Sequence, residues 1–275
     1  LNWITGLNYN QTKTGVIVEK NEKTQCVEIT DFIKSYSAKS GGSLSWFSPR
    51  IYQLGRSISK YKPDYLVQAG AGFILFPLSI LALFNKVKFI HRIANNVDVD
   101  DRIYKKISYK SVFFYKIGLL LTPIISCQNN YQYRAIKSKF PRKKVIKVLN
   151  PYDTTKLKLK PYSLKERKYI AWVGIFQHQK NIPLLYKTAK KLTDIEFRIA
   201  GEVIDNPDKN TQNALSELKT LNNVTFVGYL TREKIEPFLS KALCLLNTSL
   251  YEGFPNTFLE SFAVGTPVAT IEDID

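Results

Sequence analysis

Short apolar runs alternate with amphipathic segments along most of the chain. The runs are bounded by glycine, proline or polar residues, as is typical of buried strands, and the segments between them carry apolar residues at helical spacing. Strands are predicted at residues 2–5, 16–19, 25–29, 63–69, 87–93, 123–127, 144–149, 169–173, 196–200, 223–227, 242–246 and 268–271. Helices are predicted at 49–61, 73–84, 131–139, 183–192 and 212–221, after Asn256, and after a capping Thr231, where Pro237 should shorten or bend the helix. This alternation predicts an α/β fold with parallel sheets.

The chain divides near its middle. Asn150-Pro151 closes the first set of elements, and a lysine-rich stretch up to Lys168 leads into the second. With 275 residues in all, each half is large enough for a hydrophobic core of its own. We therefore predict two domains, residues 1–149 and residues 150–275.

One stretch, from Leu250 to Ala269, organises the second half. It follows the apolar run at 242–246 and begins with a tight polar loop, after which apolar residues recur at helical spacing. Gly265 is suited to a left-handed helix end and Pro267 prevents the helix from continuing, so a new strand should follow. The stretch therefore predicts a βαβ turn of a parallel sheet.

The chemistry of this turn indicates an anion site. Glu252 lies on the loop at the carboxyl end of a strand, where open α/β sheets bind ligands. Gly253 allows close approach of a ligand, and Asn256 or Thr257 can cap the helix, whose first amides favour phosphate. Glu260 falls about one turn into the helix, so both carboxylates can flank one ligand and bind its hydroxyls. The alternative is an ordinary turn with two solvated glutamates.

Charge and composition narrow the class of protein. The formal net charge of +17 attracts polyanions, but there is no helix-turn-helix, zinc-finger or RNP-like pattern, so nucleic acid is not expected as a partner. Plain surface solubility explains much of this charge equally well. The three cysteines have neither metal nor disulfide spacing and no signal peptide is visible, so a cytoplasmic location is expected. No acidic or histidine cluster suggests a metal.

Two apolar stretches raise the question of a membrane. Neither residues 73–84 nor residues 105–121 provide the ~20 apolar residues that span a bilayer. The second stretch mixes lysines with aromatic residues, which suits peripheral contact with an anionic membrane at its inner face. Packing of one face against the core is an equal alternative.

The stretch Leu250–Ala269 resembles the Glu-x7-Glu motif of retaining GT-B glycosyltransferases of the family-four, or group 1, type. Its Phe-Pro-Asn-Thr-Phe-Leu-Glu sequence followed by Gly-Thr-Pro-Val carries the resemblance. The resemblance implies two Rossmann-like domains facing across a cleft, with 1–149 on the acceptor side and 150–275 binding the nucleotide sugar. It implies transfer of a sugar from a nucleotide diphosphate sugar to a glycan or lipid-linked acceptor, in cell-surface polysaccharide biosynthesis, without a cofactor or a metal.

The same resemblance implies roles for single residues. Lys180 is similar to the lysine on the donor pyrophosphate, Glu260 to the carboxylate that holds the ribose hydroxyls, and Glu252 to the one beside the transferred sugar. Asn95 aligns with a position that reaches the donor sugar, and with Glu252 and Lys180 it completes the implied catalytic set. The remaining implied donor-binding residues are Gly174, Gly201, Glu202, Gly228, Tyr229, Gly253, Phe254, Pro255, Asn256 and Thr257.

The chain also departs from the family pattern. Ile175 stands where an arginine often follows the Val-Gly pair, and Asn95 stands where a histidine is common; His91 lies within a strand and is expected to be structural. The opening strand with its Gly-rich loop and the closing helices are not seen, so both domains are expected to be incomplete. A weakly active donor-binding homologue, a GT-B epimerase or phosphorylase, and a non-enzymatic polyanion-binding protein therefore stay open as alternatives.

Overall fold

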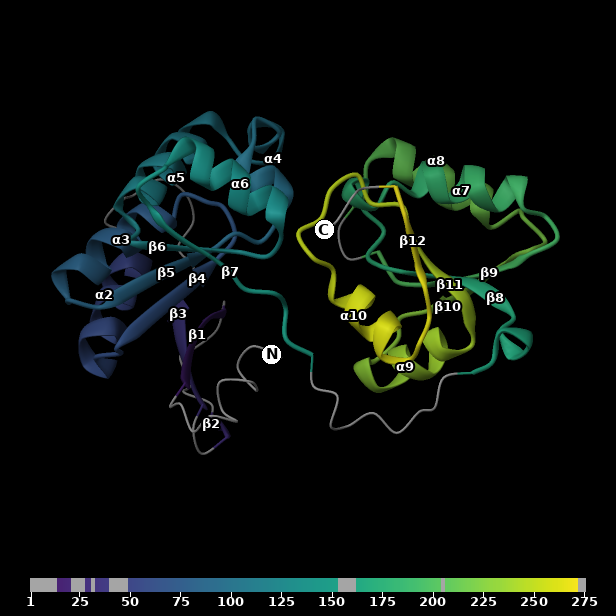
Figure 1. The fold of residues 1–275 in the computed structure, drawn as a ribbon, viewed down its shortest axis with the longest axis horizontal. Helices are drawn as coiled ribbons and strands as arrows, with labels where there is room; N and C mark the ends of the chain where they lie inside the picture. Colours follow the sequence, from purple (N-terminus) through teal and green to yellow (C-terminus); the bar gives the residue numbers. More distant parts are fainter. Residues whose placement is uncertain are drawn as a thin grey trace. The chain divides into compact units, whose positions relative to one another are not determined.

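The computed structural model describes residues 14–20, 28–30, 33–39, 49–152, 162–203 and 206–271. Internal contacts divide the chain into two units, Leu1–Pro151 and Tyr152–Asp275, whereas the sequence predicts the boundary between residues 149 and 150 (Figure 1). The strand predicted at 2–5 lies outside the described residues. Each unit is described by itself below.

The described residues of unit 1 form two sheets. The larger one is parallel, in the order β4-β5-β6-β7, and the smaller one has the order β1-β3-β2, in which β1 and β3 are parallel and β2 is antiparallel to β3. The strands are β1 (Thr14–Lys20), β2 (Glu28–Thr30), β3 (Ile33–Lys39), β4 (Tyr65–Ala69), β5 (Lys88–Arg92), β6 (Ile124–Cys127) and β7 (Lys144–Lys147). The helices are α2 (Pro49–Tyr61), α3 (Leu75–Phe84), α4 (Ile103–Lys106), α5 (Tyr109–Leu121) and α6 (Asn130–Lys139), with a 3₁₀ turn η1 (Asn96–Val99).

Helices α3 and α5 pack closely because of a glycine. A Cβ atom added at Gly118 of α5 would lie 2.7 Å from Leu75 Cγ and 2.9 Å from the backbone nitrogen of Phe76. One turn further along both helices, the buried Ser79 hydroxyl lies 3.1 Å from that of Thr122. The two helices therefore run parallel in direct contact, as expected when both connect neighbouring parallel strands.

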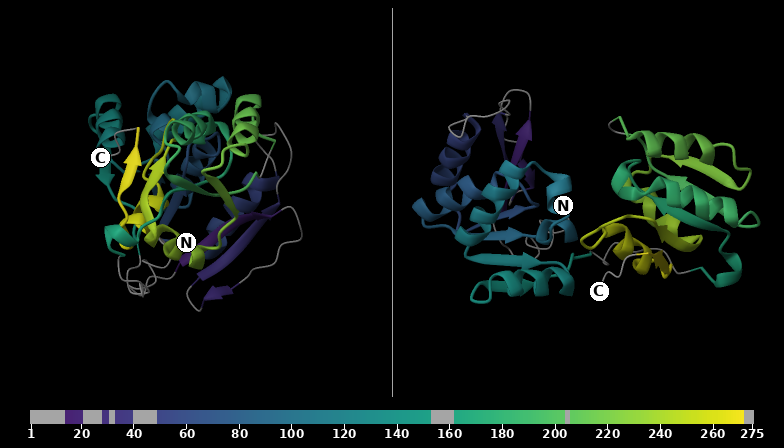
Figure 2. Two further views of the ribbon diagram at one scale, coloured as in Figure 1. Left: turned by 90° about the vertical axis from the view of Figure 1, so that its right-hand side faces the viewer. Right: turned by 90° about the horizontal axis from the view of Figure 1, so that it is seen from above.

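Unit 2 is one parallel sheet between two pairs of helices. The strands have the order β10-β9-β8-β11-β12 and can be followed in further views in Figure 2. They are β8 (Tyr169–Val173), β9 (Glu196–Ala200), β10 (Val224–Gly228), β11 (Ala242–Asn247) and β12 (Val268–Thr270). Helices α7 (Ile182–Lys191) and α8 (Lys209–Leu218) cover one face, and α9 (Arg232–Ser240) and α10 (Asn256–Ala263) cover the other (Figure 1). Two short 3₁₀ turns, η2 (Leu164–Glu166) and η3 (His178–Lys180), precede β8 and α7.

Side chains of β8 point alternately to the two faces of the sheet, which explains why helices cover both faces. Ile170 and Trp172 belong to the core beneath α7 and α8, while Tyr169 and Ala171 belong to the core beneath α9 and α10. Successive side chains of a strand point to opposite faces, so a run that is apolar throughout is buried on both. Arg167, just before β8, donates hydrogen bonds to the carbonyl groups of Ala242 and Gly265 at 3.0 and 2.6 Å, and so ties this strand to the segments around β11 and β12.

The structure adds detail to several local predictions. The stretch at 105–121 is divided between α4 and α5, where the Ser108 hydroxyl accepts from the backbone of Ser111. Thr231 has the N-cap position of α9 but makes no capping hydrogen bond, and α9 continues past Pro237 to Ser240. No helix in the described part of the chain is both long and apolar enough to cross a bilayer.

Candidate functional site

The carboxyl ends of β8, β9 and β10 in unit 2 each carry one of the glycines predicted from the sequence. The amide of Gly174 donates to Ala200 O at 3.0 Å, and that of Gly201 donates to Gly228 O at 2.9 Å. A Cβ atom at Gly201 would lie 1.9 Å from the carbonyl oxygen of Gly174, so only glycine fits there. Gly228 has φ +73°, a conformation that glycine adopts without strain. These strand ends therefore form a tightly connected backbone edge.

The loop after β8 is bound to the loop after β11. Leu250 N donates to Gln179 O at 2.8 Å, and the Gln179 side chain donates to Tyr251 O at 2.9 Å. The Thr248 hydroxyl donates to Lys180 O at 2.6 Å. Polar groups from two distant stretches of sequence thus hold the two loops against each other.

This connection brings two predicted site residues together. Lys180 Nζ lies 2.6 Å from Glu252 Oε1, and the two side chains are only 21% and 11% exposed. An ion pair that is largely shielded from water is stronger, and more costly to break, than one on the surface. The sequence places both residues at strand ends, but the direct contact between them is a finding of the structure.

The second glutamate of the motif has different surroundings. Glu260 lies on α10, and burial raises its pKa; Arg232 acts in the opposite direction and Glu236 in the same one. Glu236, which contributes to this rise in the pKa of Glu260, accepts a hydrogen bond from Tyr152. Glu260 thus faces groups of α9 and the start of unit 2, whereas Glu252 pairs with the loop after β8.

The start of α10 differs from the prediction. Pro255 has the N-cap position, with φ −64° and ψ 134°, and makes no side-chain capping bond. Asn256 and Thr257 are already helical, so neither is the N-cap residue. The N-terminal turn of α10 nevertheless follows the Glu252 loop directly, as an anion site requires.

The other predicted residues of unit 2 differ in exposure. Gly253 is buried and Phe254 lies 6.2 Å from Phe258, centroid to centroid, so both belong to the packing of the loop. Glu202 and Tyr229 are exposed at the ends of β9 and β10, and Tyr229 is 66% exposed. Their predicted roles toward a nucleotide stay predictions.

Two polar residues directly after β11, Thr248 and Ser249, were not predicted from the sequence as site residues. Thr248 accepts from Trp172 Nε1 at 3.1 Å while it donates to Lys180 O, and it is fully buried. The hydroxyl of Ser249 is buried without a hydrogen-bond partner in the part of the chain that the structure describes. Thr248 and Ser249 directly follow a buried strand, at the edge of a parallel sheet where ligands bind. That position is the sequence signal by which they could have been predicted.

In unit 1, the loop after β5 is a fixed turn and not an open polar loop. Asn95 Oδ1 accepts from Val97 N at 3.2 Å, and Asn95 N donates to Asp98 Oδ2 at 3.1 Å, which forms a capping box. Asp98 is fully buried and pairs with Lys106 at 2.7 Å. The predicted catalytic Asn95 therefore stabilises the turn through its oxygen atom.

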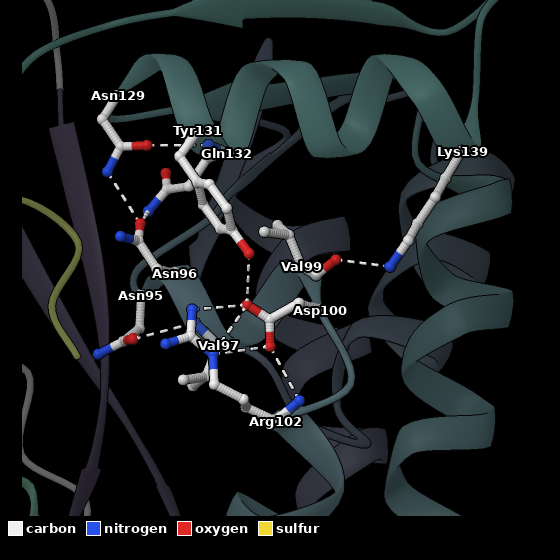
Figure 3. A network of polar contacts seen from close by, with 10 residues as sticks. All are labelled: Asn95, Asn96, Val97, Val99, Asp100, Arg102, Asn129, Tyr131, Gln132 and Lys139. Atoms are coloured by element: carbon white, nitrogen blue, oxygen red, sulfur yellow. Dashed lines mark hydrogen bonds and ion pairs between the residues drawn. The ribbon is translucent and has the colours of Figure 1, made fainter. Parts of the chain in front are cut away.

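Polar contacts hold this turn against α6 (Figure 3). Asn129 and Gln132 both donate to Asn96 Oδ1, at 2.9 and 3.1 Å. Arg102 and Tyr131 point toward Asp100, at 2.7 and 2.9 Å (Figure 3). Burial pushes the pKa of Asp100 up, but the hydrogen bonds from Arg102 and Tyr131 outweigh it and leave that pKa below its ordinary value.

His91 has the structural surroundings that the sequence predicts. Burial lowers its pKa to about 3, so the ring is neutral. Its Nδ1 lies 2.7 Å from Gln68 Oε1, which only accepts, so Nδ1 donates and Nε2 accepts from the Tyr115 hydroxyl at 3.2 Å. Next to it, Arg92 donates to Asn150 at the end of unit 1.

Comparison with known proteins shows which proteins the chain is similar to. Residues 153–274 match the family model "Glycosyl transferases group 1". The chain is 26% identical over 263 residues to an uncharacterized glycosyltransferase of Methanocaldococcus jannaschii, covering 86% of this chain and 63% of the relative. Solved structures with a similar fold include sucrose-phosphate synthase from Thermosynechococcus elongatus (TM-score 0.70, 13% identity, 96% of this chain and 72% of that chain).

A second similar structure is a TarM mutant from S. aureus in complex with fondaparinux, α-GlcNAc-glycerol and UDP, with TM-score 0.59 and 18% identity. The match covers 80% of this chain and 44% of the TarM chain. The chain thus spans less than two thirds of the length of TarM and of the M. jannaschii relative. Residues 153–274 thus match the group 1 glycosyltransferase family, and the fold of the chain is similar to that of solved GT-B glycosyltransferases.

Proposed function

We propose that the chain transfers a glycosyl group from a nucleotide diphosphate sugar to a glycan or lipid-linked acceptor, with retained anomeric configuration, in polysaccharide biosynthesis. The observation that carries the proposal is the Lys180–Glu252 pair, which lies at the strand-end edge of the unit that matches the family. A cation paired with the loop that leads into the N-terminus of α10 suits a diphosphate. UDP is present in the TarM complex, which supports a nucleoside diphosphate as the ligand class.

In this proposal, the bond between the anomeric carbon and the diphosphate oxygen breaks while a bond to the acceptor oxygen forms. Negative charge grows on the departing diphosphate, which takes up the proton of the acceptor hydroxyl. Lys180 and the first turn of α10 stabilise that charge, which is the largest contribution such a site makes to the rate. Glu260 accepts from the ribose hydroxyls and Glu252 from a hydroxyl of the transferred sugar, without a metal ion or a cofactor.

Asn95 is proposed to contact the donor sugar, but only through its side-chain nitrogen. Because its oxygen caps the turn after β5, a contact with the donor sugar would use its amide nitrogen. That nitrogen donates and cannot act as a base. Asn95 is therefore proposed to orient a sugar hydroxyl and not to accept a proton.

Incubation with UDP-, GDP- and ADP-sugars, with and without EDTA, followed by mass spectrometry tests the activity. Transfer to an added glycan or lipid-linked acceptor supports the proposal, and NMR of the product's anomeric proton reports retention. An epimerised nucleotide sugar, or a sugar 1-phosphate formed in the presence of phosphate, would instead identify an epimerase or a phosphorylase. Failure to bind or convert any nucleotide sugar would contradict the proposal.

A lipid-linked acceptor implies contact with the inner face of the membrane, and we place that contact on α5. Four of its apolar residues are exposed, and Tyr109, Phe113 and Leu120 are spaced so that they share one side of the helix: Tyr109, Phe113, Leu120 and Leu121 are 76%, 61%, 58% and 47% exposed. Lys105 and Lys110 are exposed near its start, and each such lysine near an anionic surface contributes about 1 kcal/mol.

Vesicle sedimentation tests this contact with Lys105→Glu combined with Lys110→Glu. Lys106 is avoided, because its change to glutamate would oppose the buried Asp98. The variant should lose binding to anionic vesicles, whereas Lys187→Glu with Lys191→Glu, which changes the charge equally on α7, should retain it. Equal binding of both double variants would reject α5 as the docking face.

A further inference from the structure

The positive charge of the chain lies almost entirely in unit 1. Leu1–Pro151 contains 24 lysines and arginines and 8 acidic residues, a net charge of +16, whereas Tyr152–Asp275 contains 16 and 15, a net charge of +1. A lysine-rich composition or a need for solubility would raise the charge of both units alike. The difference therefore indicates that unit 1 meets an anionic partner.

The densest part of this charge is the stretch from the start of α6 to the end of β7. Residues 130–147 include seven basic residues and no acidic one: Arg134, Lys137, Lys139, Arg142, Lys143, Lys144 and Lys147. Lys147 donates to Asn130 Oδ1 at 2.7 Å, and Lys137 donates to Lys143 O at 3.0 Å, so α6 and β7 are joined at both ends. The basic residues of the two elements therefore form one surface, which we call the α6–β7 surface.

The charges of the α6–β7 surface are not neutralised by acidic side chains. In the part of the chain that the structure describes, none of the seven residues forms an ion pair. Four of the lysines donate to neutral oxygen atoms instead, as Lys139 does to Val99 O at 2.6 Å (Figure 3). A lysine ammonium has three donors and keeps its charge in such a contact, so these side chains can still hold an anionic ligand.

The kind of anionic partner follows from the absence of apolar side chains. Within residues 132–148, all of which the structure describes, no large hydrophobic side chain is exposed, whereas α5 exposes Tyr109, Phe113 and Leu120. Contact with a bilayer is favoured by apolar side chains that insert among the lipids, so α5 suits a membrane and the α6–β7 surface suits a hydrated polyanion. The ten residues of α6 extend over about 15 Å, a length that suits several linked sugars better than a single one.

We propose that the α6–β7 surface binds an acceptor glycan that itself carries carboxylate or phosphate groups. The inference rests on the proposed function in taking the bound glycan as the acceptor. The carboxyl end of β7, at Lys147, lies at the edge of the parallel sheet where ligands bind, so a glycan chain can pass from that edge along the surface. Because the basic side chains are mostly exposed, the contact weakens as salt is added.

Binding of oligogalacturonate, a chain with one carboxylate on each sugar, tests the proposal, with its neutral methyl ester as the ligand control. Arg134→Glu with Lys144→Glu changes two exposed side chains, neither of them among the four lysines that donate to neutral oxygen atoms. In calorimetric titration at about 0.15 M salt, where only nearby charges are felt, this variant should bind oligogalacturonate roughly tenfold more weakly than wild type. Arg56→Glu with Lys60→Glu on α2 changes the net charge equally and should leave the affinity within about twofold of wild type.

Failure of wild type to bind oligogalacturonate, equal weakening by the two double variants, or equal binding of the methyl ester would overturn the inference. Binding of anionic vesicles or of RNA through Arg134 and Lys144, without binding of oligogalacturonate, would also overturn it and identify a membrane or a nucleic acid as the partner. Selective loss of oligogalacturonate binding, in a chain that converts no nucleotide sugar, would leave the polyanion surface standing and reject the proposed function. Transfer to a neutral acceptor without binding of oligogalacturonate would support the proposed function and reject the anionic acceptor.

Discussion

The contact between two strand ends beneath the Lys180 loop makes Gly201→Ala a sensitive test of the site's geometry. The added Cβ would lie 1.9 Å from the carbonyl oxygen of Gly174, where a carbon–oxygen contact needs about 3.3 Å. The backbone must therefore move by more than an ångström. Hydrogen bonds of 3.0 Å from Gly174 N to Ala200 O and from Phe176 N to Glu202 O oppose that movement.

The expected cost follows from these contacts. Overpacking costs about 1–3 kcal/mol and each weakened hydrogen bond about 1 kcal/mol, so we expect a loss of roughly 3 kcal/mol in the free energy of unfolding. Urea denaturation measures it, and calorimetric titration should show weaker UDP binding because the Lys180 loop is displaced. Gly72→Ala is the control, since a Cβ there meets nothing within 4 Å. If Gly201→Ala unfolds at the same urea concentration as Gly72→Ala, the close approach is wrong.

Two further predictions concern stability. Arg167→Met should lower the free energy of unfolding by about 3 kcal/mol in a urea titration, because the buried carbonyl groups of Ala242 and Gly265 lose their charged donor. Arg198→Met is the control. It should lower the free energy of unfolding by less than about 1 kcal/mol, because the Arg198–Glu196 ion pair is part-exposed. His91 has a pKa of about 3 in the folded state, against 6.5 for the free side chain. Between these two pH values the unfolded state binds more protons than the folded state, so the free energy of unfolding falls as the pH drops below 6.5. The loss should reach about 3 kcal/mol at about pH 4.5. His91→Gln should flatten that part of the pH profile and His178→Gln, at an exposed site, should not; an unchanged slope in His91→Gln would contradict the neutral buried ring.

Much of the fold could be predicted because burial leaves a clear pattern in the sequence. Strands β8 and β9 and helix α2 have the predicted bounds, since uninterrupted apolar runs and a helical apolar stripe determine them. Strand β3 was missed: its sequence, Ile-Lys-Ser-Tyr-Ser-Ala-Lys, is too polar for such a run. Its pairing with β1 and β2 is a non-local contact that periodicity does not report.

The sequence predicts which loops and helices carry the candidate-site residues, but not which of their side chains contact each other. The sequence places Lys180 and Glu252 after different strands, 72 residues apart, and only the folded sheet brings their side chains together. The N-cap residue of α10 is Pro255 and not Asn256. The fixed φ of proline suits the extended residue before a helix, and this outweighs the preference of asparagine for the N-cap position. Asn95 is the opposite case: an asparagine three residues before Asp98 is a local capping signal that the sequence already contained.

The direct test of a nucleoside diphosphate site in unit 2 is a calorimetric titration of wild type, Lys180→Ala and Glu260→Ala with UDP and with its 2′,3′-dideoxy analogue. Lys180→Ala should weaken both ligands, by roughly ten- to a hundredfold, because both carry the diphosphate. Glu260→Ala should weaken UDP similarly but affect the analogue much less, since the analogue lacks the ribose hydroxyls. Equal weakening of both ligands by Glu260→Ala, or undiminished UDP binding by Lys180→Ala, would contradict the assignment of the site.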